Sequence, residues 1–271
     1  MTTVEKNLKQ LRVLQERVDE DFARGPHGQE TTCVKGCAHC CKQMVSCSPV
    51  EALGALTLFV ERYGSAEWMA RRALVAAQAE RIMQPEYSSA KYWQEQLQCV
   101  FLQPDKSCAV YEARPTPCRT HAVITEPALC GAVSGTEMVK VVDVLGLREG
   151  MMERTWELCQ AVGMPGPVAP FQVGLLWAEI YCYFGPAALA KQLQGTPFAD
   201  PVSMIMHWLC LELHEGKTYR HRDDDRFVCL QCNAIADEPG GDLVCKHCGT
   251  DHVQLMSQLQ EAREYFGAKQ S

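Results

Sequence analysis

Cysteine is the feature that most constrains this sequence, because sixteen of its 271 residues are cysteines. Most of them fall in three groups, and the groups are Cys33, Cys37, Cys40 and Cys41; Cys99, Cys108 and Cys118; and Cys229, Cys232, Cys245 and Cys248. The first twenty residues carry charges throughout and lack the apolar core of an export signal. We therefore expect a cytoplasmic, reducing location, where structural disulfides are rare and grouped cysteines more often bind metal.

The third group has the spacing C-x2-C-x12-C-x2-C. Each C-x2-C pair lets the chain fold back over one metal ion, and two such pairs supply the four sulfurs of a tetrahedral site. Gly240-Gly241 lies between the pairs and is typical of a hairpin tip. Because a ribbon of about 40 residues cannot bury enough core alone, we predict a structural zinc site here. A single rubredoxin-like iron is the alternative.

The first two groups together supply seven thiols, which is more than one zinc ion can use. Gly36 permits the tight turn that the first group requires. The adjacent Cys40 and Cys41 cannot easily bind the same tetrahedral ion, which indicates more than one metal centre. Either two zinc ions or an iron–sulfur cluster such as [4Fe–4S] would use these thiols, and we favour the cluster. Arg119 or Arg114 could offset the negative charge of such a centre.

The same residues resemble a known family. The run Cys33-x3-Cys37-x2-Cys40-Cys41, followed by Cys99-Val-Phe-Leu and Cys108-Ala-Val-Tyr-Glu-Ala-Arg-Pro-Thr-Pro-Cys118-Arg119, is similar to the YkgJ-type cysteine-cluster (CxxCxxCC) family of zinc- or iron-chelating domains. That group includes the flagellin lysine methylase FliB, and the resemblance covers roughly residues 30–125. It implies that the chelating set is Cys33, Cys37, Cys40, Cys41, Cys99, Cys108 and Cys118.

The remaining cysteines and two histidines are less easily assigned. Scattered cysteines usually behave as small buried apolar residues, and we expect this of Cys130, Cys159, Cys182 and Cys210. Cys47 follows the first group closely enough that either role is open. His39 and His121 lie beside the cysteine groups and are alternative ligands, although a hydrogen bond to a ligand is the role that we favour for both.

Apolar periodicity and turn residues predict a mainly α-helical protein with a short β-hairpin, plus a small β zinc ribbon near the C-terminus. Helices are expected at 4–22, 48–63, 66–84, 88–98, 151–163, 170–184, 186–194, 200–215 and 253–266, with the hairpin within 99–111. Ser48-Pro49-Val50-Glu51 has the pattern of a capping box. We expect a cysteine-cluster domain at 1–125, a helical region at 126–216 and a ribbon domain with a closing helix at 217–271.

The formal net charge of -7 does not favour nucleic-acid binding, and Glu179 with Gly185-Pro186 interrupts the longest apolar run, so no membrane span is expected. The sequence predicts a metal-binding protein that works with a protein partner, in electron transfer or in the maturation of a metalloenzyme. The alternative is a cluster-dependent enzyme such as a FliB-like protein lysine methylase. No strand–glycine-rich turn–helix motif for a methyl donor is evident, so catalysis stays an open question.

Overall fold

The computed structural model describes residues 2–24, 31–33, 36–84, 87, 89–131, 145–166 and 168–194, together with the backbone of three short strands near the C-terminus. Seven α-helices lie in this part of the chain: α1 (Thr3–Arg24), α2 (Pro49–Tyr63), α3 (Ser65–Ile82), α4 (Ser89–Gln94), α5 (Thr116–Arg119), α6 (Leu145–Val162) and α7 (Phe171–Leu193). Single 3-10 turns form η1 (His39–Lys42), η2 (Tyr111–Ala113) and η3 (Pro127–Gly131). The mainly helical fold that the sequence predicts is confirmed.

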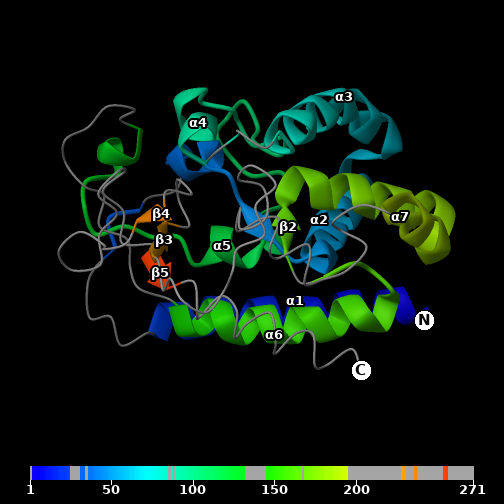
Figure 1. Cartoon of the computed structure of the whole chain (residues 1–271). Helices are drawn as coiled ribbons and strands as arrows, with labels where there is room; N and C mark the ends of the chain where they lie inside the picture. The colour runs from blue at the N-terminus through cyan, green and yellow to red at the C-terminus, as the bar shows by residue number, and fades with distance from the viewer. Residues whose placement is uncertain are drawn as a thin grey trace.

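The long helices pack in layers (Figure 1). Helices α1 and α6 lie side by side along one side of the molecule, α2 and α7 form the middle, and α3 covers α7 and α2 on the opposite side. The core between them draws its largest fully buried side chains from distant parts of the sequence, among them Phe59, Trp68, Phe101 and Leu175. The cysteine-rich segments are connected to this helical body.

The start of α2 follows the capping pattern that the sequence predicts. Ser48 is the N-cap, Pro49 occupies the first turn, and the Ser48 backbone N–H donates a 3.0 Å hydrogen bond to Glu51 Oε2. Gly64, with a φ of 84°, then separates α2 from α3. A residue with a Cβ is disfavoured at this φ, so the glycine fixes the boundary between the two helices.

Helix α7 is the central helix of the fold. Its length and composition alone would allow a membrane span, but 44% of that apolar window is buried inside the protein. Glu179 accepts hydrogen bonds of 3.1 Å from Trp68 Nε1 and 2.8 Å from Arg72 Nε, both in α3. The predicted break at Gly185-Pro186 is present as a kink, with Gly185 at a φ of 82°. These contacts are typical of a core helix.

Two short antiparallel strands connect the start of α2 with the start of α7. Strand β1 (Ser46–Cys47) pairs with β2 (Ala169–Pro170), so that Cys47 lies opposite Ala169. The Phe171 backbone N–H extends the pairing with a 2.8 Å hydrogen bond to the Val45 carbonyl. This pairing holds the chain that leaves the first cysteine group against the core.

The predicted hairpin within 99–111 is present in a minimal form. Leu102 and Cys108 form a single antiparallel bridge, and the Ala109 N–H donates a 2.9 Å hydrogen bond to the Phe101 carbonyl. Asp105 Oδ1 accepts hydrogen bonds from the Ser107 N–H and hydroxyl, which closes the turn. The predicted helix at 88–98 is shorter than expected and ends at Gln94.

Near the C-terminus the structure describes a three-stranded antiparallel sheet in the order β4 (Ile235–Ala236), β3 (Phe227–Cys229) and β5 (Val253–Leu255). Strand β5 occupies the first residues of the closing helix expected at 253–266, so that expectation was wrong at its start. The remaining residues of that helix and the predicted helix at 200–215 lie outside the described residues.

Candidate metal centre

The first cysteine group lies in a tight turn before β1. Gly36 has a φ of 87°, and the His39 N–H donates a 2.9 Å hydrogen bond to the Cys37 carbonyl just before η1. Cys40 and Cys41 lie in the single turn of η1 and are half-buried, as is Cys37, whereas Cys33 is exposed. Cys37, Cys40 and Cys41 therefore lie in one short stretch of backbone directly before β1.

A backbone hydrogen bond joins the first cysteine group to the second. The Cys99 N–H donates to the Cys41 carbonyl over 2.7 Å, and Cys99 then leads into the bridge that carries Cys108. The Gln98 carbonyl accepts a hydrogen bond from the buried Gln78 of α3, which holds the approach to Cys99 against the helical body. The two groups are adjacent although 58 residues separate Cys41 from Cys99.

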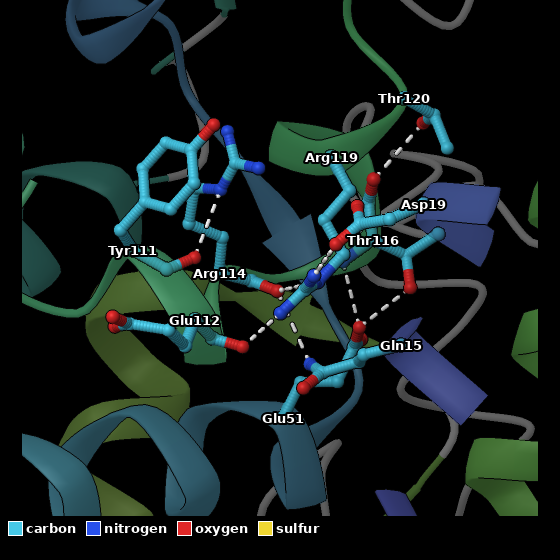
Figure 2. A network of polar contacts seen from close by, with 9 residues as sticks. All are labelled: Gln15, Asp19, Glu51, Tyr111, Glu112, Arg114, Thr116, Arg119 and Thr120. Atoms are coloured by element: carbon cyan, nitrogen blue, oxygen red, sulfur yellow. Dashed lines mark hydrogen bonds and ion pairs between the residues drawn. The ribbon is translucent and has the colours of Figure 1, made fainter. Parts of the chain in front are cut away.

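Cys118 is positioned by the short helix α5, which Glu51 secures at its start (Figure 2). The buried Glu51 carboxylate accepts 2.7 Å hydrogen bonds from both the backbone N–H and the hydroxyl of Thr116. Its second oxygen accepts from Ser48 at the start of α2. One carboxylate thus joins the starts of two helices, and α5 presents Cys118 from there.

Arg119 is turned toward α1 and toward backbone carbonyls (Figure 2). Its guanidinium forms an ion pair with Asp19, donates to the Glu112 carbonyl, and donates a 2.8 Å hydrogen bond from Nε to the Arg114 carbonyl. Gln15 of α1 donates to the same Arg114 carbonyl. Arg119 therefore fixes the shape of the loop between Cys108 and Cys118, which is a different role from the charge compensation that the sequence suggested for it.

Arg114 is the cation that acts on the thiols. Its guanidinium stacks over the Tyr111 ring, 3.7 Å from the ring centroid. Burial raises the pKa of Cys108 and Cys118, and the positive charge of Arg114 opposes this rise. The same charge adds to the lowering of the Cys40 pKa, which the hydrogen bond from Cys41 mainly causes. A cation near several thiols stabilises their ionised form, which is the form that binds metal. Of the two arginines that the sequence suggested for charge compensation, Arg114 is therefore the one whose charge acts on these thiols.

The thiols of the two groups lie within electrostatic reach of one another. A hydrogen bond from Cys41 lowers the pKa of Cys40 to about 7, and the same interaction raises the pKa of Cys41. Burial raises the pKa of Cys99 to about 12, and burial together with the nearby thiols Cys99, Cys40 and Cys108 raises that of Cys118. Such mutual repulsion between thiolates is relieved when a cation binds among them.

The donor set fits a thiolate-bound metal. Among the cysteines that the structure describes none forms a disulfide, so their sulfurs remain available as ligands. Within the same described residues, however, no three cysteine, histidine or acidic side chains already stand close enough to hold an ion. Metal ligation would therefore draw neighbouring thiols together, as is common for sites that form with metal binding. Soft thiolate donors select zinc, iron–sulfur clusters or copper(I) over hard cations.

Several residues outside the predicted set can now be placed. Cys47 and Cys159 belong to the hydrophobic core, whereas Cys182 is exposed, contrary to the expectation that it is buried. His39 opens η1, and His121 is half-buried beyond α5. Cys130 is buried and lies in η3, which packs against η1. Cys210 lies outside the described residues.

Little of the predicted ribbon site can be tested by the structure. The backbone of Cys229 ends strand β3, opposite Val253 of β5. The other predicted ligands, Cys232, Cys245 and Cys248, lie outside the described residues. The sheet agrees with a small β unit in this region and leaves the zinc site as a prediction.

Comparison with known families gives one match. Residues 32–134 match the model of the CxxCxxCC family, a proposed zinc- or iron-chelating domain. We call residues 32–134 the CxxCxxCC domain after this match. The match includes every cysteine of the first two groups, which confirms the family resemblance and supports metal binding by the CxxCxxCC domain. No curated protein and no solved structure matches the chain.

Proposed function

We propose that the CxxCxxCC domain holds a polynuclear metal centre bound by cysteine thiolates, with an iron–sulfur cluster favoured over zinc. The observation that carries this proposal is the meeting of three chain segments, which bring Cys41, Cys99 and Cys118 into one neighbourhood beside Arg114. A cation next to several thiols offsets the charge that a thiolate-bound cluster accumulates.

The number of thiols supports a centre with more than one metal ion. A single tetrahedral zinc ion uses four ligands, and the two groups supply seven. The adjacent Cys40 and Cys41 hydrogen-bond to each other through their side chains. Because neighbouring residues cannot easily bind the same tetrahedral ion, each of the two sulfurs is better suited to a different metal ion. Two zinc ions would also use this number of thiols. The identity of the bound metal therefore decides between an iron–sulfur cluster and a pair of zinc ions.

The role that we propose for this centre is electron transfer or assistance to the maturation of a partner metalloenzyme, in the cytoplasm. The net charge of -7 supports a protein partner over nucleic acid. The C-terminal unit would add a structural zinc ion bound by Cys229, Cys232, Cys245 and Cys248, which would stabilise a segment too small to fold on apolar burial alone.

Purification under strict exclusion of oxygen tests this proposal. Iron, zinc and acid-labile sulfide are measured per chain, and the visible absorption spectrum is recorded. Iron with sulfide and a broad visible charge-transfer band would support the cluster, whereas zinc alone would replace it by a zinc centre. Protein that holds no metal beyond one zinc ion for the ribbon would overturn the proposal.

Serine substitutions distinguish the metal site of the ribbon from that of the CxxCxxCC domain. Replacement of Cys40 and Cys41 by serine should remove the metal of the CxxCxxCC domain and leave the ribbon zinc in place. Replacement of Cys245 and Cys248 by serine should have the opposite effect. Equal metal loss in the two variants would contradict the assignment of two separate sites.

A further inference from the structure

Helix α7 begins outside the CxxCxxCC domain, yet its first two residues are connected to both cysteine groups of that domain. The Phe171 backbone N–H donates its 2.8 Å hydrogen bond to the Val45 carbonyl, four residues after Cys41. The next residue, Gln172, is connected by side-chain hydrogen bonds to the segment that leads to Cys99. The start of α7 is thus a common attachment point for the two groups.

Gln172 is a buried amide that donates to two partners. The residue is only 4% exposed, and its Nε2 donates over 2.9 Å to the hydroxyl of Tyr92 in α4 and over 3.1 Å to Oε1 of Gln78 in α3. Gln78 is also buried, and its own Nε2 donates a 3.0 Å hydrogen bond to the Gln98 carbonyl. Two side-chain amides therefore connect α7 to the backbone directly before Cys99.

The peptide bond between Gln98 and Cys99 is held at both of its polar ends. Its carbonyl accepts from Gln78, and its N–H is the donor to the Cys41 carbonyl over 2.7 Å. The amides of Gln172 and Gln78, this peptide bond and the Cys41 carbonyl therefore form one continuous chain of hydrogen bonds. Each amide in such a chain polarises the next, and a buried amide is costly to leave unpaired.

Other buried polar side chains of the helical body have a more local role. The Thr155 hydroxyl donates to the Met151 carbonyl one turn earlier in α6, and the Tyr181 hydroxyl of α7 donates to the Val162 carbonyl at the end of α6. These bonds join helices to themselves or to each other. The chain that starts at Gln172 differs because it ends on the backbone of a cysteine.

We propose that Gln172 is a positioning residue of the metal centre. Through Gln78 it holds the peptide bond that enters Cys99, while the neighbouring Phe171 holds the strand that follows Cys41. The inference rests on the proposed function, and it makes metal affinity dependent on a helix outside the CxxCxxCC domain. By thermodynamic linkage, metal binding in turn stabilises the packing of the start of α7.

The zinc affinity of side-chain variants tests this role. The parent protein and all variants carry Cys245→Ser and Cys248→Ser, which removes the predicted ribbon site from the measurement. Zinc(II) added to metal-free protein is the probe, and competition with a chromophoric chelator gives the affinity. Gln172→Met keeps a side chain of similar length without the donors and should weaken zinc binding about tenfold. Tyr181→Phe, which removes a buried hydrogen bond elsewhere on α7, should leave the affinity unchanged.

A double variant separates positioning from stability. Gln172→Met alone leaves Oε1 of the buried Gln78 without its donor, which lowers the thermal stability of the protein. Gln78→Met/Gln172→Met removes both amides, and Gln98 is exposed, so its carbonyl can bond to water. The double variant should therefore regain part of the lost stability and still bind zinc as weakly as Gln172→Met. Zinc affinity that returns together with stability would overturn the positioning role.

Failure of the proposed function would give a different result. A parent protein that holds no metal when purified without oxygen, and that takes up no zinc, would remove the metal centre itself. A parent protein that binds zinc, together with a Gln172→Met variant of equal affinity, would overturn the role of Gln172 and leave the metal centre standing.

Hydrogen exchange on the parent protein covers variants that fail to fold. Exchange of the Phe171 amide, measured by NMR, should slow about tenfold when zinc binds, because the opening of its bond to Val45 is coupled to the metal. The Gly64 amide, which bonds to the Val60 carbonyl at the opposite end of α2, should exchange equally with and without zinc. An unchanged exchange rate at Phe171 would overturn the proposal.

Discussion

The backbone N–H of Cys99 donates a 2.7 Å hydrogen bond to the carbonyl of Cys41, and this bond joins two cysteine groups that lie 58 residues apart. Between them the chain runs through α2 and α3, whose packing against α7 brings it back to the same place. The long helical insertion between the cysteine groups therefore acts as the support that returns the second group to the first.

Replacement of Arg114 should weaken metal binding, because its charge favours the ionised form of Cys40, Cys108 and Cys118. We expect Arg114→Gln to lower metal affinity about tenfold, within the range of groups that tune a site without binding the metal. Arg114→Lys should keep most of the affinity. Chelator competition measures the effect, with Arg62→Gln as the control because Arg62 pairs with Glu112 at the surface. Equal affinities of the Arg114→Gln and Arg62→Gln proteins would contradict the prediction.

Loss of the Glu51 carboxylate should destabilise the fold more than loss of an exposed one. Its oxygens accept hydrogen bonds from Ser48 and Thr116, which are buried, and unsatisfied buried donors are costly. We expect Glu51→Ala to lower the free energy of unfolding by about 3 kcal/mol. Glu67→Ala, which removes only an i,i+4 pair with Arg71, should cost about 0.3 kcal/mol. Urea denaturation compares the two variants, and similar unfolding midpoints would refute the prediction.

Arg119 and Asp19 should show unequal effects although they form one ion pair. The Arg119 side chain is 2% exposed and also donates to two carbonyls, whereas the Asp19 side chain is 44% exposed. We expect Arg119→Ala to lower the free energy of unfolding by about 3 kcal/mol and Asp19→Ala by about 1 kcal/mol. A double-mutant cycle measured by denaturation gives the coupling. A larger loss for Asp19→Ala than for Arg119→Ala would show that the carbonyl contacts matter little.

In metal-free protein Cys40 should be the most reactive thiol among the half-buried ones. The hydrogen bond from Cys41 lowers the pKa of Cys40 to about 7, while burial raises that of Cys99 to about 12. Because the thiolate is the nucleophile, alkylation of Cys40 should accelerate as the pH rises through 7 and then level off. Alkylation of Cys99 should stay slow at every pH below about 9. Mass spectrometry after short labelling pulses measures both rates, and Cys41→Ala should move the Cys40 transition to higher pH. Equal rates for Cys40 and Cys99 at pH 8 would contradict this assignment.

Local sequence signals predicted the helical body well. Ser48 and Glu51 gave the start of α2, and the conformational freedom of Gly64 gave its end. These features depend on neighbouring residues, which is why the sequence reveals them. The overextended helix at 88–98 is the exception, because Gln96 adopts a φ of 52° and ends the helical path early.

Contacts between residues far apart in the sequence were harder to predict from the sequence. The sequence indicated a role for Arg119 near the thiols, but the pairing with Asp19, one hundred residues away, depends on how α1 packs. Cys130 is buried, as the sequence predicts, but its place in η3 beside η1 depends on packing that the sequence does not show. The spacing of the third cysteine group predicts a zinc ribbon, and of its four ligands only the Cys229 backbone lies within the described residues.

Thr32 lies directly before the first cysteine, and its N–H and hydroxyl donate to the Val123 carbonyl, 91 residues further along the chain. The hydroxyl also donates to Thr125. A growing polypeptide whose Val123 and Thr125 have not yet emerged from the ribosome therefore cannot form these hydrogen bonds. The helical body that supports the cysteine groups is complete only after the central helix α7 (Phe171–Leu193) has also been synthesised, so the proposed metal centre forms late in the synthesis of the chain.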